Sequence, residues 1–168
     1  MTTFSFKETS PLTVKKLDKQ IGNADKKLNN RSVLNKKVSI FLDQWVQQNF
    51  KTEGGNVGGW PPFKHGGRVN SKGLGTQTRI YTGSTTIEVY VDKSAKLLQD
   101  TGRLRISFAP FSTQRDAGIG SDLPYSKFHN EGEGHLPRRR MLPKKYSDRD
   151  LIKKCTQIYN GYIQESFK

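Results

Sequence analysis

The stretch that decides the fold reads LLQDTGRLRISF and runs from Leu97 to Phe108. Two leucines precede Thr101-Gly102, where glycine favours a tight turn, and apolar and polar residues then alternate. A period of two is typical of a β-strand that buries one face. The sequence therefore predicts a half-buried strand over 104–108, with Arg103 and Arg105 on its outer face.

Upstream of this stretch, apolar residues recur with the period of a helix. The spacing i, i+4, i+7, i+11 occurs over 17–28 and again over 34–45, which predicts two amphipathic helices. The sequence NNRS at 29–32 predicts the break between them, because Asn and Ser favour caps and turns. Four glycines and two prolines within 53–63 end the second helix and open a flexible loop that extends to residue 75.

Between this loop and the opening stretch, the sequence predicts a β-hairpin. The segments on either side of Gly83-Ser84 are rich in β-branched residues, with Ile87, Val89 and Val91 on one face. The segment at 104–108 is predicted to supply a third strand.

The C-terminal third predicts less regular structure until a closing helix. Residues 111–124 are predicted to be irregular with a short strand near Ile119, 125–129 to form one helical turn, and 135–143 to be extended by prolines. Ser147 is the predicted N-cap of the last helix. Its predicted buried stripe comprises Leu151, Cys155, Ile158, Tyr159, Tyr162 and Ile163.

The order helix, strands, helix predicts an α+β fold in which a small, mainly antiparallel sheet packs with a long N-terminal helix and a C-terminal helix. We expect residues 1–32 to form a basic helical extension and residues 33–168 to form a single α+β domain, with the Gly/Pro-rich loop at 53–75. The apolar fraction of 32% indicates a modest core.

The chain carries a net charge of +14, from 29 Lys and Arg against 15 Asp and Glu. Such an excess favours a polyanion or an acidic protein surface as partner. The excess is spread along the sequence, so a simply solvated surface is the alternative interpretation of many of these charges. No apolar run is long enough to cross a membrane, no signal peptide is recognisable, and the single cysteine allows no internal disulfide.

The sequence presents no recognisable catalytic or metal-binding set. His65, His129 and His135 are widely scattered, GLGTQT lacks the Gly-Lys-Ser/Thr ending of a phosphate loop, and no nucleophile has an evident base. Glu131 and Glu133 have the character of exposed loop carboxylates. We therefore predict that the chain is not an enzyme and has no catalytic residue, metal or cofactor.

Four short motifs remain, and they occur in a fixed order. GGWPPF follows the predicted long helix, LLQDTGRLRISF comes next, and YSKFHNEG and LPRRRMLP precede the last helix. This order resembles the phage virion morphogenesis family, which includes the tail completion proteins of Mu-like phages and, distantly, the head–tail joining and tail-terminator proteins of long-tailed phages. The resemblance covers about 41–163. Its matching residues are Trp60, Pro62, Leu97, Leu98, Thr101, Gly102, Leu104, Ser107, Tyr125, His129, Gly132, Pro137, Arg139, Met141 and Leu142.

Two regions depart from the family pattern. Ser126 stands where the family has Ala, and the hairpin region at 78–91 is longer than the family needs. The first forty residues are also an addition to the pattern.

The resemblance implies a structural virion protein at the phage neck, which forms a homo-oligomeric ring of six subunits. It implies that this ring completes the tail and joins it to the head connector or adaptor, next to tail tube or sheath proteins, with DNA passing through the channel without sequence-specific contact. It places the protein in the virion, and in the host cytoplasm during assembly. The alternative is a sequence-independent nucleic-acid-binding protein, in which the positive charge contacts phosphates.

The candidate residues fall into two groups. The predicted partner contacts are the exposed cations Arg103, Arg105, Arg138, Arg140, Lys144 and Lys145. The predicted structural residues are Trp60, Pro62, Leu98, Thr101, Gly102, Leu104, Tyr125, His129, Gly132, Pro137 and Arg139. Within these groups we expect Trp60 to be a packing anchor, His129 to bond a loop carbonyl near Gly132, and Arg139 to be buried and paired. Arg138 and Arg140 are expected to serve assembly rather than stability.

Overall fold

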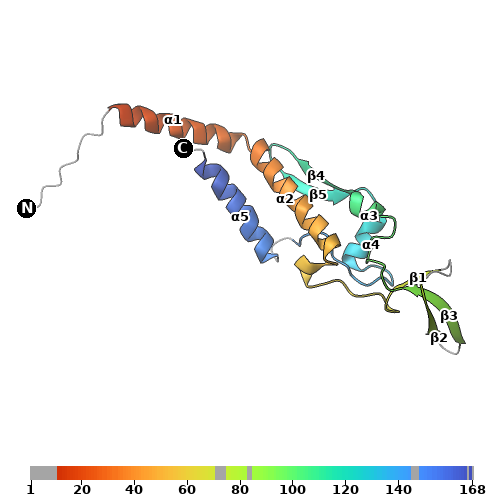
Figure 1. The fold of residues 1–168 in the computed structure, drawn as a ribbon. Helices are drawn as coiled ribbons and strands as arrows, with labels where there is room; N and C mark the ends of the chain where they lie inside the picture. The colour runs from red at the N-terminus through yellow and green to blue at the C-terminus, as the bar shows by residue number, and fades with distance from the viewer. Residues whose placement is uncertain (1–10, 71–74, 83–84, 145–147, 166, 168) are drawn as a thin grey trace, which may run out of the picture.

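The computed structural model describes residues 11–70, 75–82, 85–144, 148–165 and 167. Its helices and strands follow the order of an α+β protein, and both sheets are antiparallel. Figure 1 shows an elongated arrangement with a helix at one end and a small sheet at the other. The elements are α1 (Pro11–Asn29), α2 (Ser32–Lys51), η1 (Gly55–Val57), β1 (Arg68–Asn70), β2 (Thr76–Thr82), β3 (Thr85–Asp92), α3 (Arg103–Ile106), β4 (Phe108–Ser112), β5 (Ala117–Ser121), α4 (Tyr125–Glu131) and α5 (Arg149–Gln164).

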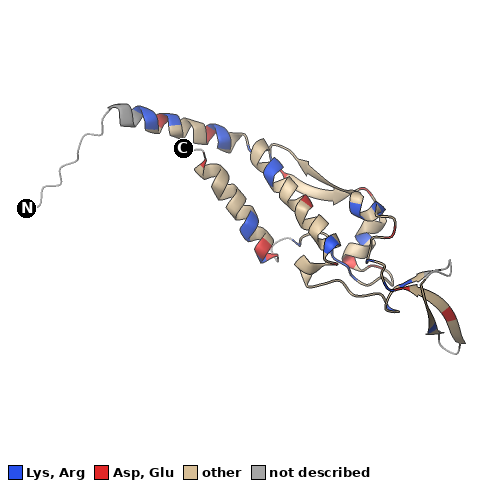
Figure 2. Ribbon diagram, in the orientation of Figure 1, with Lys and Arg blue, Asp and Glu red and all other residues tan. Residues whose placement is uncertain are grey.

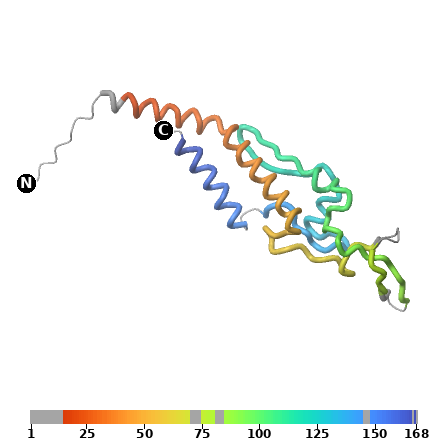
Figure 3. Tube along the Cα trace, in the orientation of Figure 1, coloured from red at the N-terminus to blue at the C-terminus, as the bar shows by residue number. Residues whose placement is uncertain are grey.

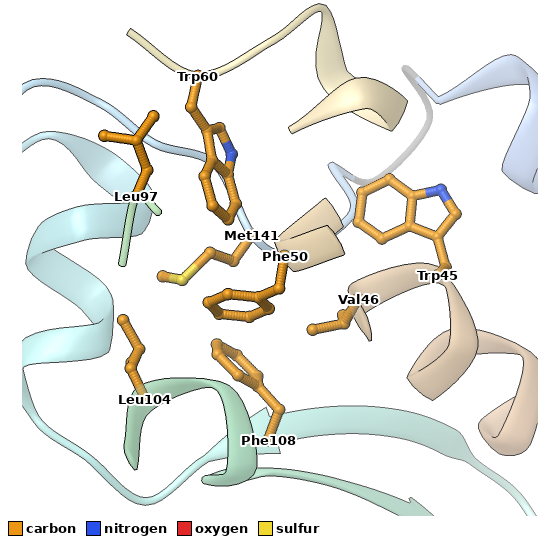
Figure 4. Packing of buried hydrophobic residues seen from close by; sticks show 8 residues of the cluster. All are labelled: Trp45, Val46, Phe50, Trp60, Leu97, Leu104, Phe108 and Met141. Atoms are coloured by element: carbon orange, nitrogen blue, oxygen red, sulfur yellow. The ribbon is translucent and has the colours of Figure 1, made fainter. Parts of the chain in front are cut away.

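The core lies at the C-terminal half of α2, where that helix packs on the hairpin of β4 and β5. Phe50 is fully buried at its centre and makes an edge-to-face contact with Trp60, with ring centroids 5.4 Å apart. Figure 4 shows Phe108 on the other side of Phe50 and Met141 beside it. Residues from four separate segments therefore share one apolar cluster, which fixes the loops around it.

The helical predictions at the N-terminus are confirmed, but the two helices differ in burial. α1 ends at Asn29 and α2 begins at Ser32, where the side chain of Asn30 accepts a 3.2 Å hydrogen bond from the backbone amide of Ser32. α2 buries Leu34 and Trp45 of its predicted apolar face and leaves Val38 and Phe41 half-buried. On α1, Leu17 and Ile21 are each 55% exposed. α1 projects away from the core and lies against α5 (Figure 1).

The predicted hairpin around Gly83-Ser84 is confirmed in β2 and β3, which pair from Thr76 with Val91 to Thr82 with Thr85. The turn residues themselves lie outside the described part of the chain. The third strand of this sheet is β1, in the strand order β1-β3-β2, and not the segment at 104–108. Val91 is fully buried at the base of the sheet, but Ile87 is 42% exposed, because the sheet extends away from the core.

The prediction of a strand over 104–108 is wrong. Arg103–Ile106 form the short helix α3, and β4 begins only at Phe108. Leu104 and Phe108 are buried as predicted, but Ile106 is 80% exposed. Residues four apart lie on the same face of a helix as well as of a strand, so Leu104 and Phe108 satisfy both periods. Ile106 distinguishes the two, because a strand would place it on the buried face with Leu104 and Phe108, whereas it is exposed.

The region at 111–124 is more regular than predicted. β4 and β5 pair from Phe108 with Ser121 to Ser112 with Ala117, which makes a full two-stranded hairpin where the sequence predicted one short strand. Residues 125–131 form α4, slightly longer than the predicted single turn, and 135–143 contain neither helix nor strand.

The closing helix is present, but it is less buried than predicted. Ser147 lies outside the described residues, and Asp148 is the N-cap residue of α5. Of the predicted stripe only Tyr162 is buried, while Leu151, Cys155 and Ile158 are partly exposed and Tyr159 is 42% exposed. Figure 3 shows α5 running alongside α2 toward α1, where Gln20 donates a 2.6 Å hydrogen bond to the carbonyl of Phe167. Every described helix is too short or too polar to serve as a membrane-spanning segment.

Candidate assembly surface

Trp60 ties two of the predicted motifs together. Its ring is buried in the core cluster, and Nε1 donates a 2.9 Å hydrogen bond to the backbone carbonyl of Arg140. Gly54 packs so closely that an added Cβ would collide with the Trp60 ring, and its backbone is left-handed at a φ of 90°. Glycine is required there for both reasons. Trp60 is therefore a packing anchor, as predicted.

Arg139 contacts the residues that follow Trp60, and its side chain is buried, at 8% exposure. Its guanidinium donates hydrogen bonds of 3.1 and 3.3 Å to the carbonyls of Pro61 and Pro62, and it lies over the ring of Phe63. Its partners are thus backbone carbonyls and a ring. Burial lowers the pKa of the Arg139 guanidinium, and the negative charge of Glu53 opposes that shift. The prediction of a buried, paired arginine is confirmed.

Two asparagines that the sequence analysis missed hold the segment after Arg139. The side-chain oxygen of Asn130 accepts hydrogen bonds from the backbone amides of Met141 and Leu142, at 2.9 and 3.0 Å. Asn49 is fully buried on α2, and its amide donates a 3.3 Å bond to the carbonyl of Met141. A buried polar side chain needs such partners. The only sequence signal for the role of Asn130 was its place in YSKFHNEG, near the end of the predicted helical turn.

His129 is placed differently from the prediction. Its carbonyl accepts a 2.7 Å hydrogen bond from the backbone amide of Arg139, but its ring Nδ1 is buried without a hydrogen-bond partner among the described residues. Tyr125 meets the ring edge-on, at 6.3 Å between centroids. Burial, followed by the charge of Arg139, lowers the pKa of His129. The ring therefore favours its neutral form.

Together these contacts make one structural unit, which we call the motif junction and define as Trp60, His129, Asn130, Arg139 and Met141 with their hydrogen bonds. It joins three of the four predicted motifs directly, and the fourth contributes Leu97 and Leu104 to the adjoining core. Gly102 and Gly132 both adopt the left-handed conformation, at φ values of 73° and 75°. The backbone of Leu97 is bonded in turn to the carboxylate of Glu53.

The predicted contact cations after Arg139 have unequal environments. Arg140 makes a bidentate ion pair with Asp148, at 2.7 and 2.9 Å, and both side chains are mostly buried. Arg138 is exposed and donates only a 3.4 Å bond to the carbonyl of Asn130. The backbone amide of Lys144 donates to Asp148, and Lys145 lies outside the described residues. Arg140 therefore has a role within the chain, which the sequence analysis did not anticipate because it missed Asp148.

Arg138, Arg140 and Lys144 nevertheless line one pocket of about 330 Å³ beside Trp60. Arg103 lines a different pocket, while Arg105 donates a 2.8 Å hydrogen bond to the side chain of Gln47 on α2. Figure 2 shows Lys and Arg distributed along the ribbon from α1 to the small sheet. The structure does not gather the predicted contact cations into one patch.

No cluster of metal ligands and no activated thiol is found among the described residues. Among them no three His, Cys, Asp or Glu side chains gather in a way that would hold a metal ion. Burial raises the pKa of the Cys155 thiol, which disfavours the reactive thiolate.

Comparison with known proteins leaves the family resemblance as an inference from motifs, since no family model, curated protein or solved structure matches the chain.

Proposed function

We propose that this chain is a structural protein of a tailed-phage virion, which forms a ring at the neck, completes the tail and joins it to the head connector around the DNA channel. The observation that carries the proposal is the motif junction. Motif residues that lie up to 80 positions apart in sequence, such as Trp60 and Arg140, meet in one hydrogen-bonded unit. The four motifs contact one another in the motif junction and the adjoining core. This contact supports the family resemblance from which the function is proposed.

The shape of the chain supports ring formation by a repeated contact. α1 and the β1-β3-β2 sheet extend from opposite ends of the molecule (Figure 1). Both carry exposed apolar residues, among them Leu17, Ile21, Val69 and Ile87. A contact between unlike surfaces of neighbouring copies generates a closed ring when the rotation between them closes. In the proposed ring, contact between neighbouring copies covers these exposed apolar residues. Closure of the ring needs no catalysis.

The charge of the chain supports placement beside an acidic partner or DNA. Exposed cations steer acidic surfaces and phosphates into contact, and surface pairs contribute little to folding. Three of the described predicted contacts are exposed and have no carboxylate partner among the described residues: Arg103, Arg105 and Arg138.

The test is removal of the chain during phage assembly. We expect a phage that lacks the encoding gene to produce full heads and separate tails that do not join, when lysates are viewed by electron microscopy. Supplying the intact chain in trans should restore joined particles. Normal particles in its absence would contradict the proposal.

The alternative function, sequence-independent nucleic-acid binding, is favoured by the net charge of +14. It predicts binding of a double-stranded DNA fragment by the isolated chain, with an affinity that falls steeply as salt rises. Normal head–tail joining without the chain, together with such binding, would favour this alternative.

A further inference from the structure

A second pocket, of about 300 Å³, opens between α3, α4 and the turn that precedes α3. Its apolar lining comes from three segments of the chain, through Phe63, Leu98 with Leu104, and Tyr125. Leu104 is buried, and the other three side chains are at least partly exposed to the pocket or to solvent. The pocket thus offers apolar contact to a small group that enters it, at the lower end of the size range of ligand sites.

Three cations line the same pocket. Arg68 is paired with Asp100, which also lines it. Lys96 and Arg103 line it as well, and neither side chain has a carboxylate partner among the described residues. With Asp100 counted and His129 neutral, the lining carries two positive charges that nothing in the described chain neutralises. Cations placed next to apolar surface attract an anion that carries an apolar part.

The walls of the pocket contain two features that packing alone does not explain. Leu98 has a left-handed backbone at a φ of 59°, which is uncommon for a residue with a side chain. His129 lines the pocket, yet its Nδ1 is buried without a partner among the described residues. Strained backbone and unpartnered polar atoms collect at binding sites, where a ligand offsets their cost.

We propose that this pocket binds a carboxylate carried on a small apolar group. The carboxylate pairs with Lys96 and Arg103, and the apolar group contacts Phe63, Leu98 and Leu104. A bare phosphate fits this lining less well, because it has no apolar part to contact these side chains. The site goes beyond the proposed function, since it requires neither a ring nor a virion.

The carboxylate has two possible sources, an acidic side chain of a polypeptide and a free organic acid. Three probes distinguish them when added to the ¹⁵N-labelled full chain in NMR titrations. The first is the blocked dipeptide acetyl-Asp-Leu-amide, the second is 4-methylpentanoate, and the third is the neutral dipeptide acetyl-Asn-Leu-amide. Inorganic phosphate serves as the apolar-free anion.

We expect saturable shifts of the backbone amides at 96–104 and of the His129 imidazole with at least one of the two carboxylates. The tighter of the two identifies the source. The neutral dipeptide and phosphate should each bind at least roughly tenfold more weakly than the better carboxylate. The neutral dipeptide lacks the carboxylate, and phosphate lacks the apolar group. The bound carboxylate should also raise the pKa of His129, since a nearby negative charge favours the imidazolium.

A charge-removal variant tests the two unpaired cations. Lys96→Gln combined with Arg103→Gln should weaken carboxylate binding roughly tenfold while leaving the thermal unfolding temperature unchanged. Arg115→Gln is the matched control, because Arg115 is an exposed arginine in the turn between β4 and β5 and does not line the pocket. Absence of saturable binding by both carboxylates, equal binding of the neutral dipeptide, or equal loss in Arg115→Gln would overturn the proposal. These results leave the head–tail joining test untouched, so the two proposals fail separately.

Discussion

At the scale of single residues, three adjacent arginines have three different environments. Arg138 is exposed, Arg139 is buried against backbone carbonyls and Phe63, and Arg140 is paired with Asp148. The three residues lie outside any helix or strand, and their side chains have different burial. The stability effects of these arginines should therefore differ sharply, although they are chemically identical.

Arg139→Ala should lower the free energy of unfolding by about 2–4 kcal/mol, because it leaves two carbonyls unpaired and opens a gap beside Phe63. Urea unfolding of the isolated chain measures this loss. Arg138→Ala is the matched control and should change stability by less than about 0.5 kcal/mol, since Arg138 is exposed. Equal effects of the two substitutions would contradict the placement of Arg139.

Arg140 and Asp148 should show strong energetic coupling, because their ion pair is bidentate and mostly excluded from water. In a double-mutant cycle with Arg140→Ala and Asp148→Ala, we expect a coupling energy of about 1–3 kcal/mol. The ion pair with Asp148 revises the expectation from sequence that Arg140 is dispensable for stability. A coupling energy near zero would show that the pair does not form in solution.

The neutral state of His129 makes stability depend on pH. Burial and the charge of Arg139 hold its pKa below the unfolded value of about 6.5. Below that pH the unfolded chain binds a proton that the folded chain does not, so the free energy of unfolding falls as pH drops toward the folded pKa. We expect stability to rise from about pH 5 to pH 7, and to rise less in His129→Gln. An unchanged pH profile in that variant would contradict the expectation.

At the scale of elements, the sequence predicted the helices and the hairpin well but misassigned α3. The periods of a strand and of a helix agree at Leu104 and Phe108, and the four residues of α3 are too few to show a helical period. Its contacts to residues distant in sequence, such as the bond from Arg105 to Gln47, are also invisible to a local period. α1 shows the opposite case, because its apolar spacing predicted the helix correctly but not the exposure of Leu17 and Ile21.

The parts of the candidate site that depend on a large aromatic side chain or on a glycine could be predicted from sequence. The parts that depend on hydrogen bonds between distant residues could not. Trp60 and Gly132 could be identified as structural from sequence, because an aromatic at a helix end and a glycine after a short helix have few other uses. Asn130 and Asp148 could not, since their partners lie in backbone amides and in Arg140. A sequence without its fold does not show which amides converge on one oxygen.

Gly132 tests the end of α4 at the level of backbone geometry. A Cβ added there would lie 2.8 to 3.0 Å from the Cβ, Cα and N of Arg138, in a backbone with a φ of 75°. Gly132→Ala should therefore cost about 1–3 kcal/mol of unfolding free energy. Gly134→Ala is the control, because its φ is also left-handed but nothing lies within 4 Å of the added Cβ. Chemical denaturation that shows equal losses would indicate strain alone and no contact with Arg138.

At the scale of the whole molecule, the core is confined to the middle of an elongated chain. Among the side chains that the structure describes on α1, Ala24 alone is a buried apolar residue, so this helix adds little to the core. In the proposed ring, the exposed apolar residues of α1 contact another copy of the chain.

Leu17→Gln combined with Ile21→Gln should change the unfolding free energy by less than about 0.5 kcal/mol, because both side chains are exposed. The same variant should reduce incorporation of the chain into particles, since the proposed ring covers this face. Lys19→Gln with Asn23→Gln is the control on the same helix, and it should incorporate normally. Normal incorporation of the Leu17 and Ile21 variant, measured by immunoblot of purified particles, would exclude this face from the ring contact.

The most direct test of the central claim is a cryo-electron microscopy reconstruction of the neck of the mature particle. The account predicts one closed ring of this chain, with six copies, between the head connector and the tail tube and with DNA passing through its centre. A monomeric state of the isolated chain would not bear on the claim, because the ring forms during assembly. Absence of the chain from the particle, or a single copy at the neck, would contradict it.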